Sequence, residues 1–99
     1  MKLEIDSAFW REVVAIGARY DGERDRLGDD FVEAVDHSLG EILEHPLAWA
    51  VWPGLRQPAH PIRRFVMSRF PYIIADQVVG ETIAVAGIAH AKRRPGTWG

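Results

Sequence analysis

Cysteine is absent from the 99-residue chain, so neither disulfide bonds nor thiolate chemistry can contribute to its stability or activity. Long apolar runs are also absent. The first thirteen residues lack the uninterrupted hydrophobic stretch of a secretory signal, and no later run approaches the length of a membrane span. We therefore expect a cytoplasmic protein that does not associate with membranes.

Motifs for nucleotide, metal and serine chemistry are missing as well. The segment VVGETIAVAG places its glycines in an expected hairpin and strand, not at the start of a helix where they could cradle a phosphate. No serine lies in a nucleophile-elbow sequence. The histidines show no metal-ligand spacing, and they are His37, His45, His60 and His90. The sequence thus predicts neither a cofactor nor a metal ion.

Charge is unevenly distributed between the two halves of the chain. Residues 1–50 carry five basic and twelve acidic side chains, whereas residues 51–99 carry seven basic and two acidic ones. Their net charges are therefore −7 and +5, although the whole chain has a formal charge of −2. Such asymmetry favours a polyanionic or acidic partner for the basic half. Alternatively, acidic helices and basic strands simply offset one another within one fold.

The first half has the pattern of a strand followed by two helices. Residues 2–6 alternate apolar and charged side chains, which is typical of a half-buried strand, and Asp6 or Ser7 could cap a following helix. Apolar residues recur at helical spacing from Phe9 to Tyr20, and again over residues 27–44. A polar turn at residues 20–25 would join the two into an antiparallel helical hairpin.

Two further expectations concern the second helix. Its buried face would be formed by Leu27, Phe31, Val35, Leu39, Ile42 and Leu43. Gly40 lies inside this helix, where glycine costs about 1 kcal/mol relative to alanine, so we expect another segment to approach it closely.

Residues 47–61 contain three prolines and cannot form regular structure over their length. They also contain Trp49 and Trp52, whose large apolar rings set the segment apart from a flexible linker. We expect these rings to pack over the edge of the core, with a role in a partner interface as the alternative.

The second half has the pattern of three strands, at residues 62–67, 72–79 and 82–91. Gly80-Glu81 suits a two-residue hairpin turn, and such short connections favour an antiparallel meander. The sequence therefore predicts a single α+β domain over residues 1–99, in which the helical hairpin covers the meander. The strand residues expected beneath the helices include Phe65, Ile73, Ile74, Val85 and Ile88.

Basic residues gather at the ends of these strands. Arg63 and Arg64 begin the first strand and would lie at one end of the meander. Arg69 closes the same strand, and His90 lies at the end of the last one. Because antiparallel neighbours share an edge, we expect the opposite end to hold one patch, formed by Arg69, His90 and some of Lys92, Arg93 and Arg94.

Charge-assisted hydrogen bonds from such a patch could stabilise a phosphate or a row of carboxylates. His90 is its only candidate general acid or base, although a histidine at a strand end is more often a structural hydrogen-bonding residue. Residues 92–94 could equally be a solvated tail, which Trp98 would anchor by burying its ring.

The sequence LGDDFVEAVDHSLGEILEHP, followed by RRFVMSRFPYIIADQV and VAGIAHAKRRPGTW, resembles the RelE/ParE superfamily of type II toxin-antitoxin toxins, on the ParE-like (plasmid stabilization) side. The similarity covers the chain from about residue 27 onward. Its most specific parts are Arg-Phe-Pro-Tyr at residues 69–72 and Ala-His-x-x-Arg-x-Pro at residues 89–95.

The resemblance implies a toxin that is neutralised by a small antitoxin encoded by an adjacent gene. The antitoxin would wrap the toxin with its C-terminal segment and bind operator DNA with its N-terminal part, so the toxin would reach DNA only indirectly. ParE-like members inhibit DNA gyrase. RelE-like members cut mRNA in the ribosome, using basic residues to hold the phosphate and a tyrosine near the C-terminus in the chemistry.

The residues that match these two branches differ. Arg69 matches an arginine that both branches can carry, and Lys92 and Arg94 match basic residues of the ribonuclease branch. The tyrosine does not carry over, because Thr97-Trp98 stands where ParE-like members often have Tyr-Trp. The comparison favours a toxin that binds gyrase and leaves its enzymatic status open. The alternatives are a ribosome-dependent endoribonuclease using Arg69, His90, Lys92 and Arg94, and a toxin-like binding module without toxicity.

Overall fold

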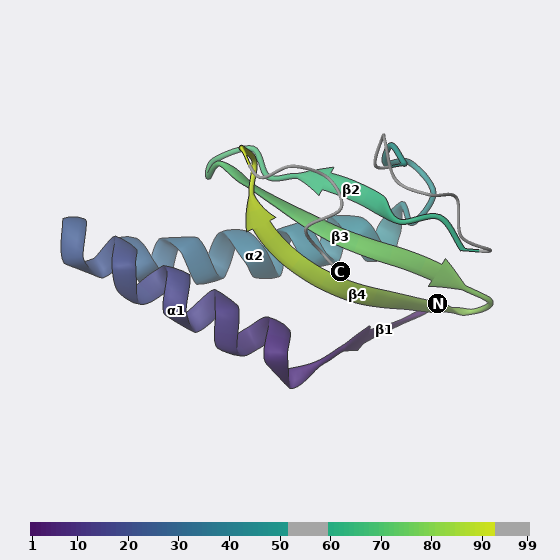
Figure 1. The fold of residues 1–99 in the computed structure, drawn as a ribbon, viewed down its shortest axis with the longest axis horizontal. Coiled ribbons are helices and arrows are strands. Elements are labelled where there is room, and N and C mark those ends of the chain that lie inside the picture. Colours follow the sequence, from purple (N-terminus) through teal and green to yellow (C-terminus); the bar gives the residue numbers. More distant parts are fainter. Residues whose placement is uncertain (52–59, 93–99) are drawn as a thin grey trace.

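The computed structural model describes residues 1–51 and 60–92 and confirms the predicted α+β fold. Strand β1 (Lys2–Ile5) precedes helices α1 (Ser7–Glu23) and α2 (Leu27–Glu44). Strands β2 (Arg63–Val66), β3 (Tyr72–Val79) and β4 (Thr82–His90) follow (Figure 1). Among the described residues, no helix combines the length and apolar character needed to cross a membrane.

The four strands form one sheet in the order β1-β4-β3-β2. The pairs β2–β3 and β3–β4 are antiparallel, as expected of the meander, whereas β1 adds to β4 in parallel and makes the sheet mixed. Gly80 supplies the first residue of the two-residue turn between β3 and β4, with a φ of +61° that favours glycine.

The carboxylate of Asp6 caps α1 by accepting a 3.0 Å hydrogen bond from the Ala8 amide.

The helical hairpin contains a close contact between two glycines. Gly28 at the start of α2 packs directly against Gly17 of α1, and its amide donates a 2.7 Å hydrogen bond to the Asp21 carboxylate. A side chain at Gly28 would collide with both neighbours, so this position requires glycine.

Two expectations about the helices are wrong. The first helix continues to Glu23, into the polar turn predicted at residues 20–25, and ends where the Arg24 amide donates a hydrogen bond to the Tyr20 carbonyl. Gly40 has no close neighbour, since a Cβ built there meets no atom within 4 Å.

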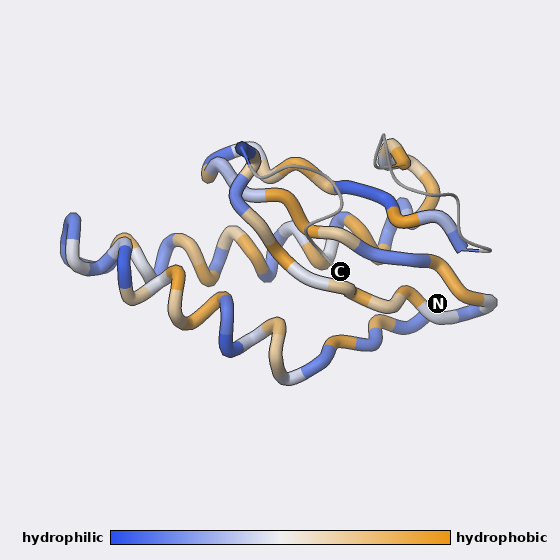
Figure 2. The backbone as a smooth tube through the Cα atoms, viewed as in Figure 1, coloured by the Kyte–Doolittle hydropathy of each residue, from blue (hydrophilic) through white to orange (hydrophobic). Residues whose placement is uncertain are grey.

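The main hydrophobic core lies between the helices and one face of the sheet. Both helices alternate hydrophobic and hydrophilic segments along their length (Figure 2). The largest completely buried side chains include Phe31 and Ile42 of α2 with Ile74, Ile83 and Ile88 of the sheet.

Two predicted core positions lie elsewhere. Leu43, expected on the buried face of α2, is 39% exposed, because Leu39 and Ile42 already occupy the side that faces the sheet. Ile73, expected beneath the helices, packs on the opposite face of the sheet with Ala75 and Ile62. Alternation along β3 explains this, since its neighbours Tyr72 and Ile74 both face the helices.

A β-bulge in β4 changes which side chains face the helices. Val85 pairs with Asp76, whereas Gly87 pairs with the preceding residue of β3, so Ala86 is the extra residue. The bulge allows Val85 and Ile88, which are an odd number of positions apart, to enter the same core. It also fixes the direction of His90 at the end of the strand.

Candidate functional site

An aromatic cluster fills the end of the molecule where β3 begins and β4 ends. Tyr20 of α1, Phe31 of α2, Phe70 of the turn and Tyr72 of β3 pack together, with ring centroids 5.0–6.4 Å apart. The His90 ring lies edge-on to Tyr72 at 5.3 Å. The Ala91 amide donates a 2.8 Å bond to the Pro71 carbonyl, which holds the two chain segments together. His90, a predicted site residue, therefore packs against this aromatic cluster.

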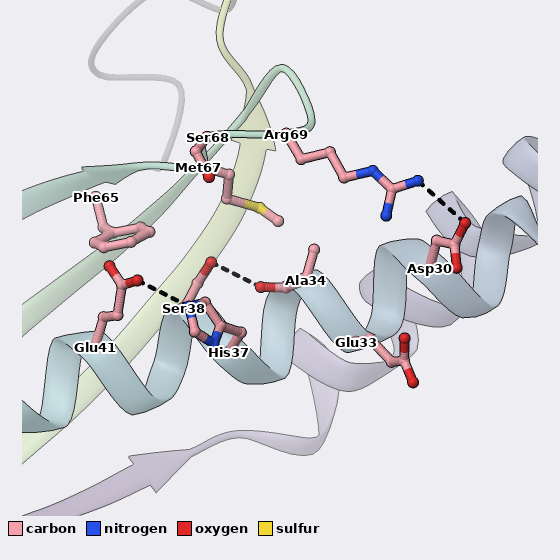
Figure 3. A pocket seen from close by; sticks show the side chains of 10 residues that line it. All are labelled: Asp30, Glu33, Ala34, His37, Ser38, Glu41, Phe65, Met67, Ser68 and Arg69. Atoms are coloured by element: carbon pink, nitrogen blue, oxygen red, sulfur yellow. Dashed lines mark hydrogen bonds and ion pairs between the residues drawn. The ribbon is translucent and has the colours of Figure 1, made fainter.

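Arg69 lies on one side of this cluster, in a groove that we call the α2 groove. It has a volume of about 300 Å³ and separates α2 from β2 and the following turn. Its lining residues are Asp30, Glu33, Ala34, His37, Ser38, Glu41, Phe65, Met67, Ser68 and Arg69 (Figure 3). Arg69 reaches across the groove and places Nη2 3.1 Å from the Asp30 carboxylate.

The other polar groups of the α2 groove are largely paired within it. His37 Nε2 lies 3.0 Å from the Glu41 carboxylate, and the Ser38 hydroxyl donates a 2.8 Å bond to the Ala34 carbonyl (Figure 3). Arg69 also places Cζ 5.2 Å from the centre of the Phe70 ring. An incoming anion would have to compete with Asp30 for Arg69, which disfavours a preformed phosphate site here.

His90 lies on the other side of the aromatic cluster, in a hollow between α1 and the sheet that we call the α1 cleft. Two adjoining cavities of about 310 and about 420 Å³ form this cleft. Both are lined by Ile16, Arg19, Tyr72 and His90. Glu12 lines the first cavity, whereas Tyr20 and Glu23 line the second.

The chain itself fixes the tautomer of neutral His90. Its Nδ1 accepts a 3.2 Å hydrogen bond from the Lys92 amide, so the proton of the neutral ring resides on Nε2. The bulge at Ala86 directs this ring toward the helices, because without the extra residue the pairing from Val79 and Thr82 would bring Ala89 opposite Tyr72. His90 can thus donate a hydrogen bond on the α1 side of the sheet.

Burial also perturbs a phenol in the α1 cleft. Desolvation raises the pKa of Tyr20, and the nearby Tyr72 phenol and Glu23 carboxylate raise it further, while Arg19 opposes the shift. The hydroxyl is protonated near neutral pH, as in an ordinary tyrosine, and its raised pKa makes it harder to ionise, so it can donate a hydrogen bond.

Arg63 lies at the opposite end of the meander from His90, as predicted. Arg63 lies opposite Asp76 of β3 in the strand register. Its Nη1 donates a 2.9 Å hydrogen bond to the Trp49 carbonyl. Asp76 is 1% exposed, and its Oδ1 has no hydrogen-bond partner. Burial raises the pKa of this carboxyl to about 6, against the opposing effect of Arg63.

Arg64 and Trp49 lie near Arg63 and have different settings. The Arg64 amide donates a 2.8 Å bond to the Ala50 carbonyl, at the outer edge of β2. The predicted packing of Trp49 is confirmed, because its half-buried ring meets Phe65 edge-on at 4.6 Å. Trp52 lies outside the described residues.

The predicted basic patch is thus divided in two. Arg69 and His90 occur at the same end of the sheet, but Arg69 enters the α2 groove and His90 enters the α1 cleft. Lys92 is exposed next to His90. Arg93, Arg94 and Trp98 lie outside the described residues.

Sequence reasoning missed Arg19 and both tyrosines as neighbours of His90. The sequence did carry a signal for Tyr72. Regular pairing counted from the turn at Gly80-Glu81 places Tyr72 opposite Ala89, one residue before His90. Arg19 and Tyr20 depend on how α1 packs against the sheet, which local patterns do not specify.

Comparison of the sequence with known proteins does not assign the chain to a family. No family model matches the chain, and no curated protein matches it. Within the described parts of the chain, no three histidine or acidic side chains are grouped so that they could hold a metal ion.

Proposed function

We propose that this chain is the toxin of a type II toxin-antitoxin pair, which inhibits growth by binding a cellular target and is neutralised by an antitoxin from an adjacent gene. DNA gyrase is the favoured target. The observation that best supports the proposal is the meeting of Arg69–Tyr72 with His90–Lys92 at one end of the sheet. These segments carry the most specific part of the resemblance to RelE/ParE toxins.

The pairing of Arg69 favours binding over RNA cleavage. Cleavage through the 2′-hydroxyl requires one group to remove a proton, another to protonate the leaving oxygen, and cations to stabilise the phosphate. Arg69 is already paired with Asp30, and burial raises the pKa of the Tyr20 phenol, which makes it harder to ionise for such a step. A protein target that replaces Asp30 by a carboxylate of its own could engage Arg69 without any proton transfer.

An endoribonuclease remains the second candidate, for one specific reason. The ring of Tyr72 lies 5.3 Å from that of His90, so a tyrosine is adjacent to the histidine although the C-terminal tyrosine of the family is missing. Primer extension on translated mRNA separates the candidates. New cleavage ends soon after induction support the ribonuclease, whereas growth arrest without such ends supports the binding toxin.

Expression in cells tests the toxin proposal itself. We expect induction of this chain alone to stop growth, and co-expression of the neighbouring small gene to restore it. An antitoxin with a DNA-binding head and an acidic tail would fit the net charge of +5 on residues 51–99. Normal growth during strong expression would contradict toxicity and support the third candidate, a toxin-like binding module.

A further inference from the structure

Four residues that carry hydrogen-bond donors line the α1 cleft. The donors are the guanidinium of Arg19, the hydroxyls of Tyr20 and Tyr72, and Nε2–H of His90. Both tyrosines line the cleft, where Tyr72 is 8% exposed and Tyr20 is half-buried. A concave site lined by hydrogen-bond donors can receive an acceptor from outside.

Arg19 is available to the same acceptor. Within residues 1–51 and 60–92 its guanidinium forms no ion pair, whereas Arg24 and Arg69 both contact Asp30. Arg19 lines the same cavity as Tyr20, and its charge lowers the pKa of that phenol. A cation beside three neutral donors is the arrangement that stabilises an oxyanion through charge-assisted hydrogen bonds.

Two carboxylates restrict which oxyanion can enter. Glu12 lines one cavity and Glu23 lines the other. Both belong to α1, where Glu12 precedes Arg19 by about two turns and Glu23 follows it by about one. They would repel the neighbouring phosphates of a nucleic-acid strand, because every nucleotide carries a negative charge. A single carboxylate with a basic side chain beside it would instead find an opposite charge at each position.

We infer that the α1 cleft binds one carboxylate side chain of a partner protein, with a basic side chain of the same segment facing Glu12 or Glu23. The carboxylate accepts hydrogen bonds from Arg19, the two tyrosine hydroxyls and His90. The inference does not require the partner to be an antitoxin, and it concerns a surface separate from the α2 groove that holds Arg69.

Titration with blocked peptides tests the inference by nuclear magnetic resonance. The probe is acetyl-Lys-Glu-Lys-amide, and acetyl-Lys-Gln-Lys-amide is the matched probe without the carboxylate. We expect saturable shifts of the Tyr20, Tyr72 and His90 side-chain signals, with about tenfold weaker binding of the glutamine peptide, since charged hydrogen bonds contribute more than neutral ones.

Variants identify the contacts in the same experiment. Arg19→Gln should lower the affinity for the glutamate peptide about tenfold. Tyr72→Phe keeps the aromatic ring and should lower this affinity severalfold. Arg11→Gln, on an exposed part of the same helix outside the cleft, is the matched control and should bind normally. Backbone amide spectra verify that each variant is folded.

Two results would overturn the inference. One is equal affinity for the glutamate and glutamine peptides, or binding that Arg19→Gln leaves unchanged. The other is tighter, Arg19-dependent binding of decauridylate RNA at the same signals, which would make the cleft a nucleic-acid site. Neither result bears on growth inhibition, so this inference and the toxin proposal can fail separately.

Discussion

The Arg69 guanidinium lies 3.1 Å from the Asp30 carboxylate and joins the turn before β3 to the first turn of α2. The two residues are 39 positions apart, so the contact closes the helical hairpin onto the sheet. It also occupies the arginine that the family resemblance marks for function. Under the proposed function, Asp30 would compete with the target for Arg69.

Asp30→Asn should release Arg69 from this competition. We expect the variant to bind its target more tightly, by a few-fold, while the free energy of unfolding falls by no more than about 1 kcal/mol because both groups are partly exposed. Growth inhibition and urea unfolding measure the two effects. Arg69→Gln is the partner variant and should inhibit growth less. Equal loss of activity in both variants would mean that the ion pair itself is the functional unit.

Gly28→Ala should destabilise the protein by roughly 1–3 kcal/mol, since overpacking forces neighbours to move. The new Cβ would lie 2.7 Å from the Asp21 carboxylate and would also meet the Gly17 backbone. Gly40→Ala is the matched control in the same helix, where the space is open. It should stabilise the protein by about 0.5–1 kcal/mol. Urea unfolding of both variants checks the pair, and a stable Gly28→Ala protein would contradict the glycine contact.

Asp76 should make the protein less stable as the pH rises from about 4 to about 6. Its folded-state pKa is raised to about 6 from 3.8, so the folded protein binds the proton more tightly than the unfolded chain does. The stabilising contribution of the proton is fully present below the unfolded-state value. It is lost as the pH rises through the folded-state value, at a cost of about 3 kcal/mol.

Asp76→Asn isolates this effect, because the amide has nearly the same shape and does not titrate in that window. The difference in unfolding free energy between the original protein and Asp76→Asn should therefore shift between pH 4 and pH 7, in favour of the variant at the higher pH. Urea unfolding at several pH values measures it. A difference that does not vary with pH would show that Asp76 is not desolvated.

Trp49→Phe should preserve most of the stability that Trp49→Ala removes. The ring contacts Phe65 edge-on, whereas the buried indole Nε1 has no hydrogen-bond partner. Phenylalanine keeps an aromatic contact and removes the unsatisfied donor, while alanine loses the ring, at a cost of roughly 3 kcal/mol. Thermal unfolding of the two variants checks the order. A more severe loss in Trp49→Phe would indicate that the indole N–H is satisfied in solution.

Much of the fold could be predicted from local patterns. The β-rich run of β3 and the helical periodicity of α2 depend on neighbouring residues, so both elements were predicted nearly to the residue. The side of the sheet that Ile73 faces and the bulge at Ala86 were not predicted. Both depend on strand register, which a single inserted residue changes without altering the apolar pattern.

The candidate site was less predictable, for a related reason. The sequence places Arg69 and His90 at one end of the sheet, and the structure agrees. It does not specify that Asp30 would pair with the first, or that Tyr72 would contact the second. Those contacts are tertiary, and their geometry follows from the packing of the helices.

Inhibition of purified DNA gyrase by the purified protein tests the central claim most directly. We predict that supercoiling of relaxed plasmid DNA falls as the protein concentration rises, that Arg69→Gln inhibits less, and that the neighbouring antitoxin restores supercoiling. Undiminished supercoiling at protein concentrations that stop protein synthesis in a translation reaction would contradict the claim.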